Sequence, residues 1–191
     1  EIVSRDWSSD VCSSDLGNGK ICMIQTNTNP TIPSWQGDDL TTNPGSNKQA
    51  YAEVDAFHPT DANKGIEAAW QTSYTAIKAA NYIILNAERT PTTKEEVNIA
   101  IGQAKYWRAV NYFWLVRRWG PIPLVLDNEV NYERPLASVE EVYTQIVKDL
   151  QDCIATLPTD YSAAPRKYEG ANVYITKQAS QATLAAVYMA M

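Results

Sequence analysis

The sequence predicts an all-α fold built from antiparallel helical hairpins. Residues 61–88 and 138–157 carry apolar side chains at intervals of three or four, the period of an amphipathic helix. Between them, a helix is expected from about residue 94 to 119, and from Ala104 to Trp119 its apolar residues cover almost every face. We therefore expect a central helix that is buried on several sides. Gly120, Pro121 and Pro123 then stop it, because glycine suits a left-handed cap and proline cannot continue the hydrogen-bond ladder.

Residues 17–60 are expected to form loops. Four of the ten prolines lie here among many Asn, Thr, Gly and Ser residues, a composition that favours turns. Within this segment, residues 34–42 (SWQGDDLTT) combine an aromatic ring, a glycine, two carboxylates and hydroxyl groups. The run could line a ligand site, or it could be a solvated turn whose Asp side chains cap the local backbone.

Helix boundaries can be assigned from capping residues. Thr60 or Asp61 can cap the helix that starts near residue 61, and the Pro91 region ends it. A capping box, Thr92 with Glu95 or Thr93 with Glu96, starts the central helix, and the short link predicts a hairpin.

Beyond the central helix we expect a short extended piece at 122–126 and a polar loop at 127–135. A second capping box, Ser138 to Glu141, begins a helix that runs to Leu157. A further helix should run from Ile175 or Thr176 to Met191. The spacing of aromatic residues and alanines is similar to that of tetratricopeptide repeats, but no strict period is present.

The composition narrows the possible functions. The chain has 191 residues, a net charge of -6 and a pI of about 4.8, which argues against nucleic-acid binding because that needs clustered Lys and Arg. Six Trp and eleven Tyr accompany two Phe. Trp and Tyr suit surfaces that stack on sugars, although a large aromatic core would also use them. No apolar run is long enough to predict a transmembrane helix.

The ends and the cysteines give further expectations. Residues 1–16 include RDWSSDVCSSDL, which resembles the translated read-through of a sequencing adapter, so we expect this leader not to be native. We expect residues 17–191 to be the N-terminal part of a longer domain, because the last helix has no stop signal. Neither Cys22 nor Cys153 lies in a Cys-x-x-Cys metal pattern, and Cys153 is expected to be a buried free thiol.

Four ordered blocks resemble the SusD/RagB family of outer-membrane nutrient-binding lipoproteins. The central block, GQAKYWRAVNYFWLVRRWGPIPLV, is similar to the family signature G-x-A-K/R-x-x-R-A-x-x-Y-F-x-L-x-x-x-W/Y-G-x-x-P-L. The matching positions are Gly102, Ala104, Lys105, Arg108, Ala109, Tyr112, Phe113, Leu115, Gly120, Pro123 and Leu124. The other blocks are Trp70–Ile84, Arg134–Pro158 and Ile175–Met191.

The resemblance implies a tetratricopeptide-like helical scaffold with an added loop-rich region. It also implies a surface lipoprotein of the outer membrane that binds glycans, or sometimes peptides, and delivers them to a SusC-like TonB-dependent transporter. Such proteins bind and do not catalyse, and no cofactor is expected. Neither Cys12 nor Cys22 follows the small-residue motif of a lipid attachment site, so the N-terminal lipid anchor is expected upstream of this chain.

The residues expected to contact a glycan lie in loops, where flat aromatic faces and planar polar groups can meet a sugar. Trp35, Asp38 and Asp39 are the first candidates, followed by Phe57 and His58. By contrast, Trp70 and Tyr74 repeat at helical spacing and are expected in the core. Arg108 and Asn111 are expected to be structural, because an Arg in an apolar helix needs an acidic or carbonyl partner.

Two alternative functions remain open from the sequence. A cytosolic tetratricopeptide scaffold could bind peptides in its groove; an upstream lipid-attachment cysteine would argue against it. An α/α-toroid glycoside hydrolase needs two carboxylates several ångströms apart. Asp38 and Asp39 are neighbours and do not form such a pair by themselves, and no P-loop, GxGxxG, HExxH or GxSxG motif is present. The hydrolase predicts turnover of an oligosaccharide, and the binding protein predicts its retention.

Overall fold

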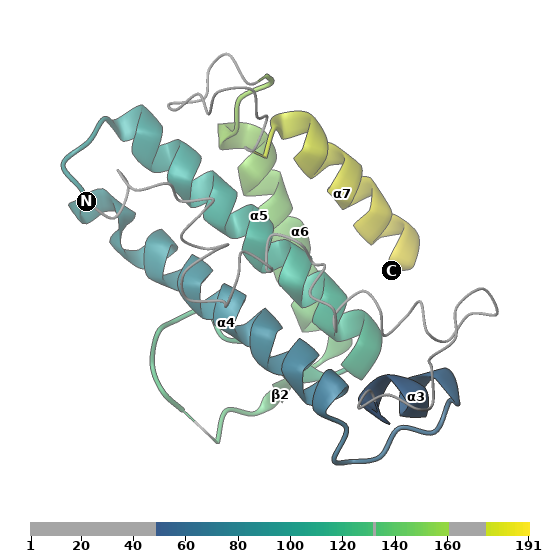
Figure 1. Ribbon diagram of the computed structural model, residues 1–191. Helices are drawn as coiled ribbons and strands as arrows, with labels where there is room; N and C mark the ends of the chain where they lie inside the picture. The colour runs from purple at the N-terminus through teal and green to yellow at the C-terminus, as the bar shows by residue number, and fades with distance from the viewer. Residues whose placement is uncertain (1–48, 132, 161–174) are drawn as a thin grey trace. The chain divides into compact units, whose positions relative to one another are not determined.

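A computed structural model describes residues 49–131, 133–160 and 175–191, and in these ranges it confirms the all-α prediction (Figure 1). The elements are α3 (Gln49–Asp55), α4 (Lys64–Asn86), the 3-10 helix η2 (Ala87–Arg89), α5 (Lys94–Trp119), β1 (Ile122–Pro123), β2 (Leu136–Ala137), α6 (Val139–Thr156) and α7 (Lys177–Ala190). The described residues divide into two compact units, 49–74 and 75–191, with the boundary inside α4. No helix in the described ranges is long and apolar enough to span a membrane.

Helix α3 shows where the expectation of loops for residues 17–60 is wrong. Its seven residues, QAYAEVD, include several good helix formers. Among the α3 residues whose burial the structure describes, Val54 is the one in the buried core, and seven residues show no clear apolar period against the Pro- and Asn-rich surroundings. The helix is therefore too short to be recognised by periodicity.

Helix α4 begins later than predicted. Its first amides are capped by Asn63, whose Oδ1 accepts hydrogen bonds from the backbone N–H groups of Gly65 (3.0 Å) and Ile66 (3.1 Å). Thr60, one of the predicted caps, instead donates its hydroxyl to Glu53. The sequence offers several capping residues in a row, and the contacts of Asn63 with α3 decide between them.

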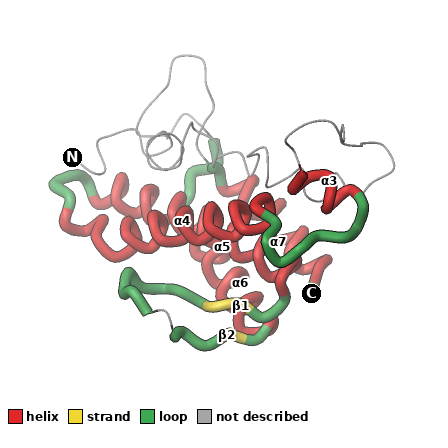
Figure 2. The backbone as a smooth tube through the Cα atoms, turned by 60° about the horizontal axis from the view of Figure 1, so that its bottom comes forward, coloured by secondary structure: helices red, strands yellow, loops and turns green. Residues whose placement is uncertain are grey.

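Helix α5 is the centre of the unit formed by residues 75–191. The capping box at its start is Thr93 with Glu96, the second of the two predicted pairs. The C-cap of the helix is Gly120, whose φ is 69° and ψ is -125°. This glycine has the positive φ of the predicted cap but lies outside the left-handed helical region. Figures 1 and 2 show α6 lying along α5, with α7 beside α6.

Close packing between α5 and α6 depends on Gly102. A Cβ atom at this position would lie 2.8 Å from both Leu157 Cδ2 and Thr156 Oγ1. The carbonyl of Gly102 also accepts a hydrogen bond from Cys153 Sγ at 3.1 Å. Cys153 is a fully buried free thiol, as predicted.

The connection from α5 to α6 carries a small hairpin that the sequence predicted only in part. The expected extended piece at 122–126 contains β1, which pairs antiparallel with β2 in the register Ile122 to Ala137 (Figure 2). Strand β2 was not predicted, because two residues directly after the polar loop are too few to show a periodic pattern. The hairpin leads directly into the predicted capping box of α6, Ser138 with Glu141.

The start of α7 is held through its backbone. Gln103 on α5 donates from Nε2 to the carbonyl of Ile175 (2.7 Å) and accepts at Oε1 from the N–H of the same residue (3.0 Å). The N–H of Lys177 donates to the carbonyl of Pro158 at 2.8 Å. Thr176 caps the helix, which begins at Lys177, one or two residues later than predicted.

Candidate functional site

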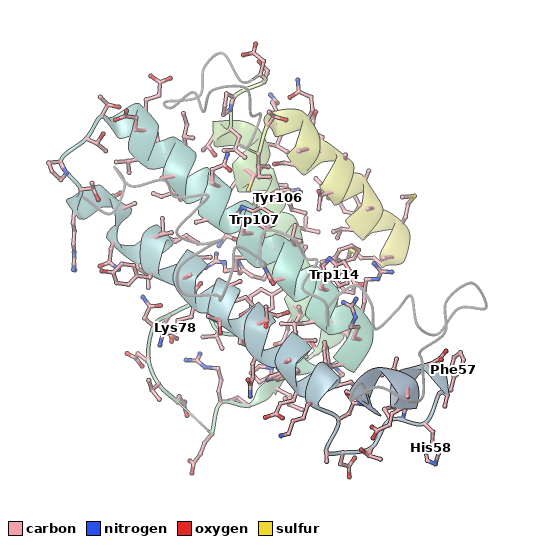
Figure 3. All side chains as sticks on the ribbon, viewed as in Figure 1. Phe57, His58, Lys78, Tyr106, Trp107 and Trp114 are labelled. Atoms are coloured by element: carbon pink, nitrogen blue, oxygen red, sulfur yellow. The ribbon has the colours of Figure 1, made fainter. Side chains whose placement is uncertain are left out.

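The predicted glycan-contacting residues divide into two groups. Trp35, Asp38 and Asp39 lie outside the described residues. Phe57 and His58 lie in the turn that follows α3, and both side chains are exposed and point away from the helix (Figure 3). The structure therefore gives a setting for two of the five candidates.

The turn after α3 is a Schellman motif with an unusual residue at its left-handed position. The N–H of Phe57 donates to the carbonyl of Val54 (3.0 Å), and the N–H of His58 donates to the carbonyl of Glu53 (2.9 Å). Phe57 has φ 54°, where glycine or asparagine is usual. For a residue with a Cβ atom, this conformation is unfavourable by roughly 1–2 kcal/mol. The Phe57 side chain is 68% exposed, so burial within the described residues does little to offset that strain.

Two polar side chains fix the same turn. Glu53 Oε2 accepts hydrogen bonds from the Thr60 N–H (3.2 Å), the Thr60 hydroxyl (3.0 Å) and Asn63 Nδ2 (2.8 Å). Asn63 is 4% exposed, and its Nδ2 also donates to the carbonyl of Ala50 at 2.9 Å. The backbone from α3 to α4 is thus tied at both ends of the segment that displays Phe57.

Trp70 and Tyr74 follow on the first half of α4. Their ring centroids are 4.9 Å apart, and the ring planes are tilted by 45°. Both side chains are partly buried rather than enclosed, so the expectation of core positions holds only in part.

Arg108 is structural, as predicted. Its Nε donates to Asp149 Oδ2 and its Nη2 to Asp149 Oδ1, each at 2.7 Å, and its Nη1 donates to Asn81 Oδ1 at 2.8 Å. The Arg108 and Asp149 side chains are 6% and 2% exposed. A buried ion pair is tolerated only when its hydrogen bonds are satisfied, and here Gln145 Nε2 adds a further bond to Asp149 at 2.9 Å.

The same network holds the segment after β1. Asn81 Nδ2 donates to the carbonyls of Val125 (2.9 Å) and Asp127 (3.1 Å). The Tyr112 hydroxyl donates to the carbonyl of Val125 (2.8 Å) and accepts from its N–H (2.7 Å). Burial raises the pKa of Tyr112 well above its usual value, so the phenol stays protonated and keeps both bonds. The backbone hydrogen bonds of this segment, which a neighbouring strand could otherwise supply, are thus made by side chains.

The loop beyond this anchor is closed by a second ion pair. Arg134 Nη2 contacts both carboxylate oxygens of Asp127, at 2.8 and 2.9 Å. The hydrogen bond from Arg134, with a smaller contribution from the Glu129 N–H, lowers the pKa of the Asp127 carboxyl. This carboxylate lies near the surface, unlike that of Asp149.

Two tryptophans on α5 form an aromatic feature that was not among the predicted site residues. Trp107 and Trp114 are two helical turns apart, both are partly buried, and the Arg118 guanidinium lies 3.8 Å from the centre of the Trp114 ring. Burial, together with nearby Arg117, lowers the pKa of Arg118 to about 10. Asn111 between them donates to the carbonyl of Trp107 at 2.8 Å, which agrees with its predicted structural role. The seven-residue spacing of the two Trp residues is the pattern by which the sequence could have revealed this feature.

Chemically, these arrangements suit binding. Among the described residues, no three His, Cys, Asp or Glu side chains gather as they would around a metal ion. Phe57, which is 68% exposed, offers a flat apolar ring rather than a reactive group.

Comparison with known proteins identifies the family. A family model described as "Starch-binding associating with outer membrane" (SusD-like_3) matches residues 19–189. A SusD-like protein of Bacteroides ovatus is 31% identical over 147 residues, which cover 73% of this chain and 25% of that protein. SusD-like protein P2 of Formosa agariphila is 35% identical over 136 residues, 65% of this chain and 27% of that protein.

Solved structures agree on the fold. Surface glycan-binding protein A from Bacteroides uniformis has a TM-score of 0.72 at 21% identity, covering 83% of this chain and 35% of that one. A structure determined with a xylogluco-oligosaccharide has a TM-score of 0.64 at 28% identity, covering 78% of this chain and 28% of that one. The chain spans about a quarter of the length of the curated relatives it matches. Its helical order, its central block and the match over residues 19–189 place the chain in the SusD-like family of starch-binding, outer-membrane-associated proteins.

Proposed function

We propose that this chain is the N-terminal part of a cell-surface protein that binds oligosaccharides and delivers them to a SusC-like TonB-dependent transporter of the outer membrane. The observation that carries the proposal is the family match over residues 19–189, whose description is starch-binding. The structural neighbour with a xylogluco-oligosaccharide, 28% identical to this chain, supports a glycan as the ligand class. In this proposal a covalently attached lipid holds the protein at the cell surface.

The protein acts by binding and needs neither catalysis nor a cofactor. Glycan recognition in this proposal uses loops carried by the helical scaffold, because loops can vary while the scaffold keeps its packing. The proposed contact residues are Trp35, Asp38 and Asp39, together with Phe57 and His58. The buried network around Arg108 supports the scaffold and takes no part in ligand contact.

The test is native affinity electrophoresis of the full-length protein in gels containing starch, xyloglucan or other polysaccharides. We expect one polysaccharide to retard the protein and to be recovered with its chain length unchanged. Trp35→Ala should reduce the retardation, whereas Tyr82→Ala, which truncates an exposed aromatic side chain on α4, should not. Normal mobility in every gel would remove the binding function, and shortening of the polysaccharide would assign a hydrolase instead.

Delivery to a transporter has a separate test. Affinity purification of the full-length protein from outer membranes should bring down a TonB-dependent transporter encoded beside its gene. If no such gene is adjacent and no transporter copurifies, the delivery role fails while glycan binding can still stand.

A further inference from the structure

We infer that Phe57 is a sugar-stacking residue, displayed by the strained turn after α3 for contact with the face of a pyranose ring. This inference rests on the proposed function and adds to it a specific contact with a physical reason. It depends on three observations: the backbone conformation of Phe57, the rigidity of its turn, and the chemistry of the exposed neighbours.

The backbone conformation argues against a purely structural role. Phe57 occupies the left-handed position of a Schellman motif, which glycine fills without a steric penalty. A bulky residue in this region is an outlier, and such outliers gather at functional sites. If the ring were present for packing, it would be buried; it is instead 68% exposed. Local stability therefore gives no reason for a phenylalanine here.

The turn is too firmly held to relax the strain by rearranging. Glu53 accepts three hydrogen bonds from Thr60 and Asn63, and Asn63 ties the turn to the carbonyl of Ala50. A ring on a fixed backbone loses little conformational freedom when a ligand binds, so more of the contact free energy appears as affinity. The hydrogen bonds of Glu53 and Asn63 thus fix the backbone from which the Phe57 ring projects.

The surroundings of the ring favour a sugar over a protein partner. His58, Thr60 and Asp61 are exposed beside it and supply hydrogen-bonding groups of both kinds. A flat apolar face with nearby polar groups matches a pyranose, which has an apolar face and a rim of hydroxyls. A protein hot spot instead has an apolar centre shielded from water. Among the described residues, Phe57 is the one large apolar side chain of residues 55–63.

The experiment uses the full-length protein with Phe57→Gly and Phe57→Trp, measuring both melting temperature and retardation by the polysaccharide that binds the wild type. Phe57→Gly should keep or raise the melting temperature, because glycine relieves the strain, and should weaken binding by about fivefold to tenfold. Phe57→Trp should preserve binding. Tyr82→Ala serves as the control for loss of an exposed aromatic side chain.

Each other outcome overturns the inference. A lower melting temperature for Phe57→Gly would assign the ring to packing, and unchanged binding would remove it from the ligand site while the proposed function stands. Loss of transporter copurification with intact glycan binding would make Phe57 a protein contact. If the wild type binds no polysaccharide, the proposed function and this inference fail together.

Discussion

The turn after α3 and the polar network of α5 are both held by hydrogen bonds to a carboxylate and an amide side chain, but they hold different things in place. In the network, Arg108 and Asp149 are almost fully buried, and every hydrogen bond holds scaffold to scaffold. In the turn, Glu53 and Asn63 form a comparable set of bonds, but the residue they position is exposed and strained. The comparison shows that a dense hydrogen-bond network does not by itself mark a functional site. The informative feature is what the network holds in place.

Breaking the buried network should have the largest effect. Asp149→Leu leaves the Arg108 guanidinium buried without its counter-ion, so we expect the free energy of unfolding to fall by about 3–5 kcal/mol. Denaturant unfolding of the full-length protein measures this change. The double variant Arg108→Met/Asp149→Leu removes both charges and should recover most of the stability; a double variant as unstable as the single one would show that the ion pair is not the cause.

Breaking the network of the turn should have a smaller, local effect. Asn63→Ala removes the cap on the amides of Gly65 and Ile66, which should lower the stability by about 1–2 kcal/mol. Hydrogen exchange at these two amides reports the loss directly. Asn63→Ser keeps a capping oxygen without placing a carboxylate beside Glu53, and it should restore part of their protection. Equal exchange in both variants would argue against a capping role.

Acidification should have the smallest effect and distinguishes a surface ion pair from the buried one. Arg134 lowers the pKa of Asp127, so this carboxylate stabilises the folded state above its unfolded pKa of about 3.9, and the contribution is lost as the pH falls through the folded value. The stability difference between wild type and Asp127→Asn should therefore close as the pH is lowered below about 4. A difference that persists at lower pH would contradict the assigned pKa.

Much of the helical scaffold could be predicted because the sequence signals that start and stop its helices are local. The capping boxes at Thr93 and Ser138 and the stop at Gly120 are each written within a few residues, and all three are found in the structure. Helix α3 and strand β2 were missed because seven and two residues are too few to show a period. Their positions depend on contacts that no short window contains.

The long-range contacts of the scaffold and the candidate site were both less predictable, for a related reason. The need of Arg108 for an acidic partner followed from its apolar surroundings, but its partner, Asp149, is 41 residues away. The positive φ of Phe57 could not be predicted either, because phenylalanine disfavours that region. The assignment of Trp35, Asp38 and Asp39 to the ligand site stays a prediction.

The attachment of α7 has a consequence for how such a protein can change over generations. Gln103 binds the main chain of Ile175, and Lys177 is tied to the carbonyl of Pro158, so neither tie depends on the side chain it meets. A hydrogen bond to the main chain places no requirement on the side chain of the residue that it holds. The two backbone ties would therefore survive a change of side chain at Lys177, whereas Ile175 also packs against the buried cluster of Ile99, Cys153 and Leu157 and is held to an apolar side chain.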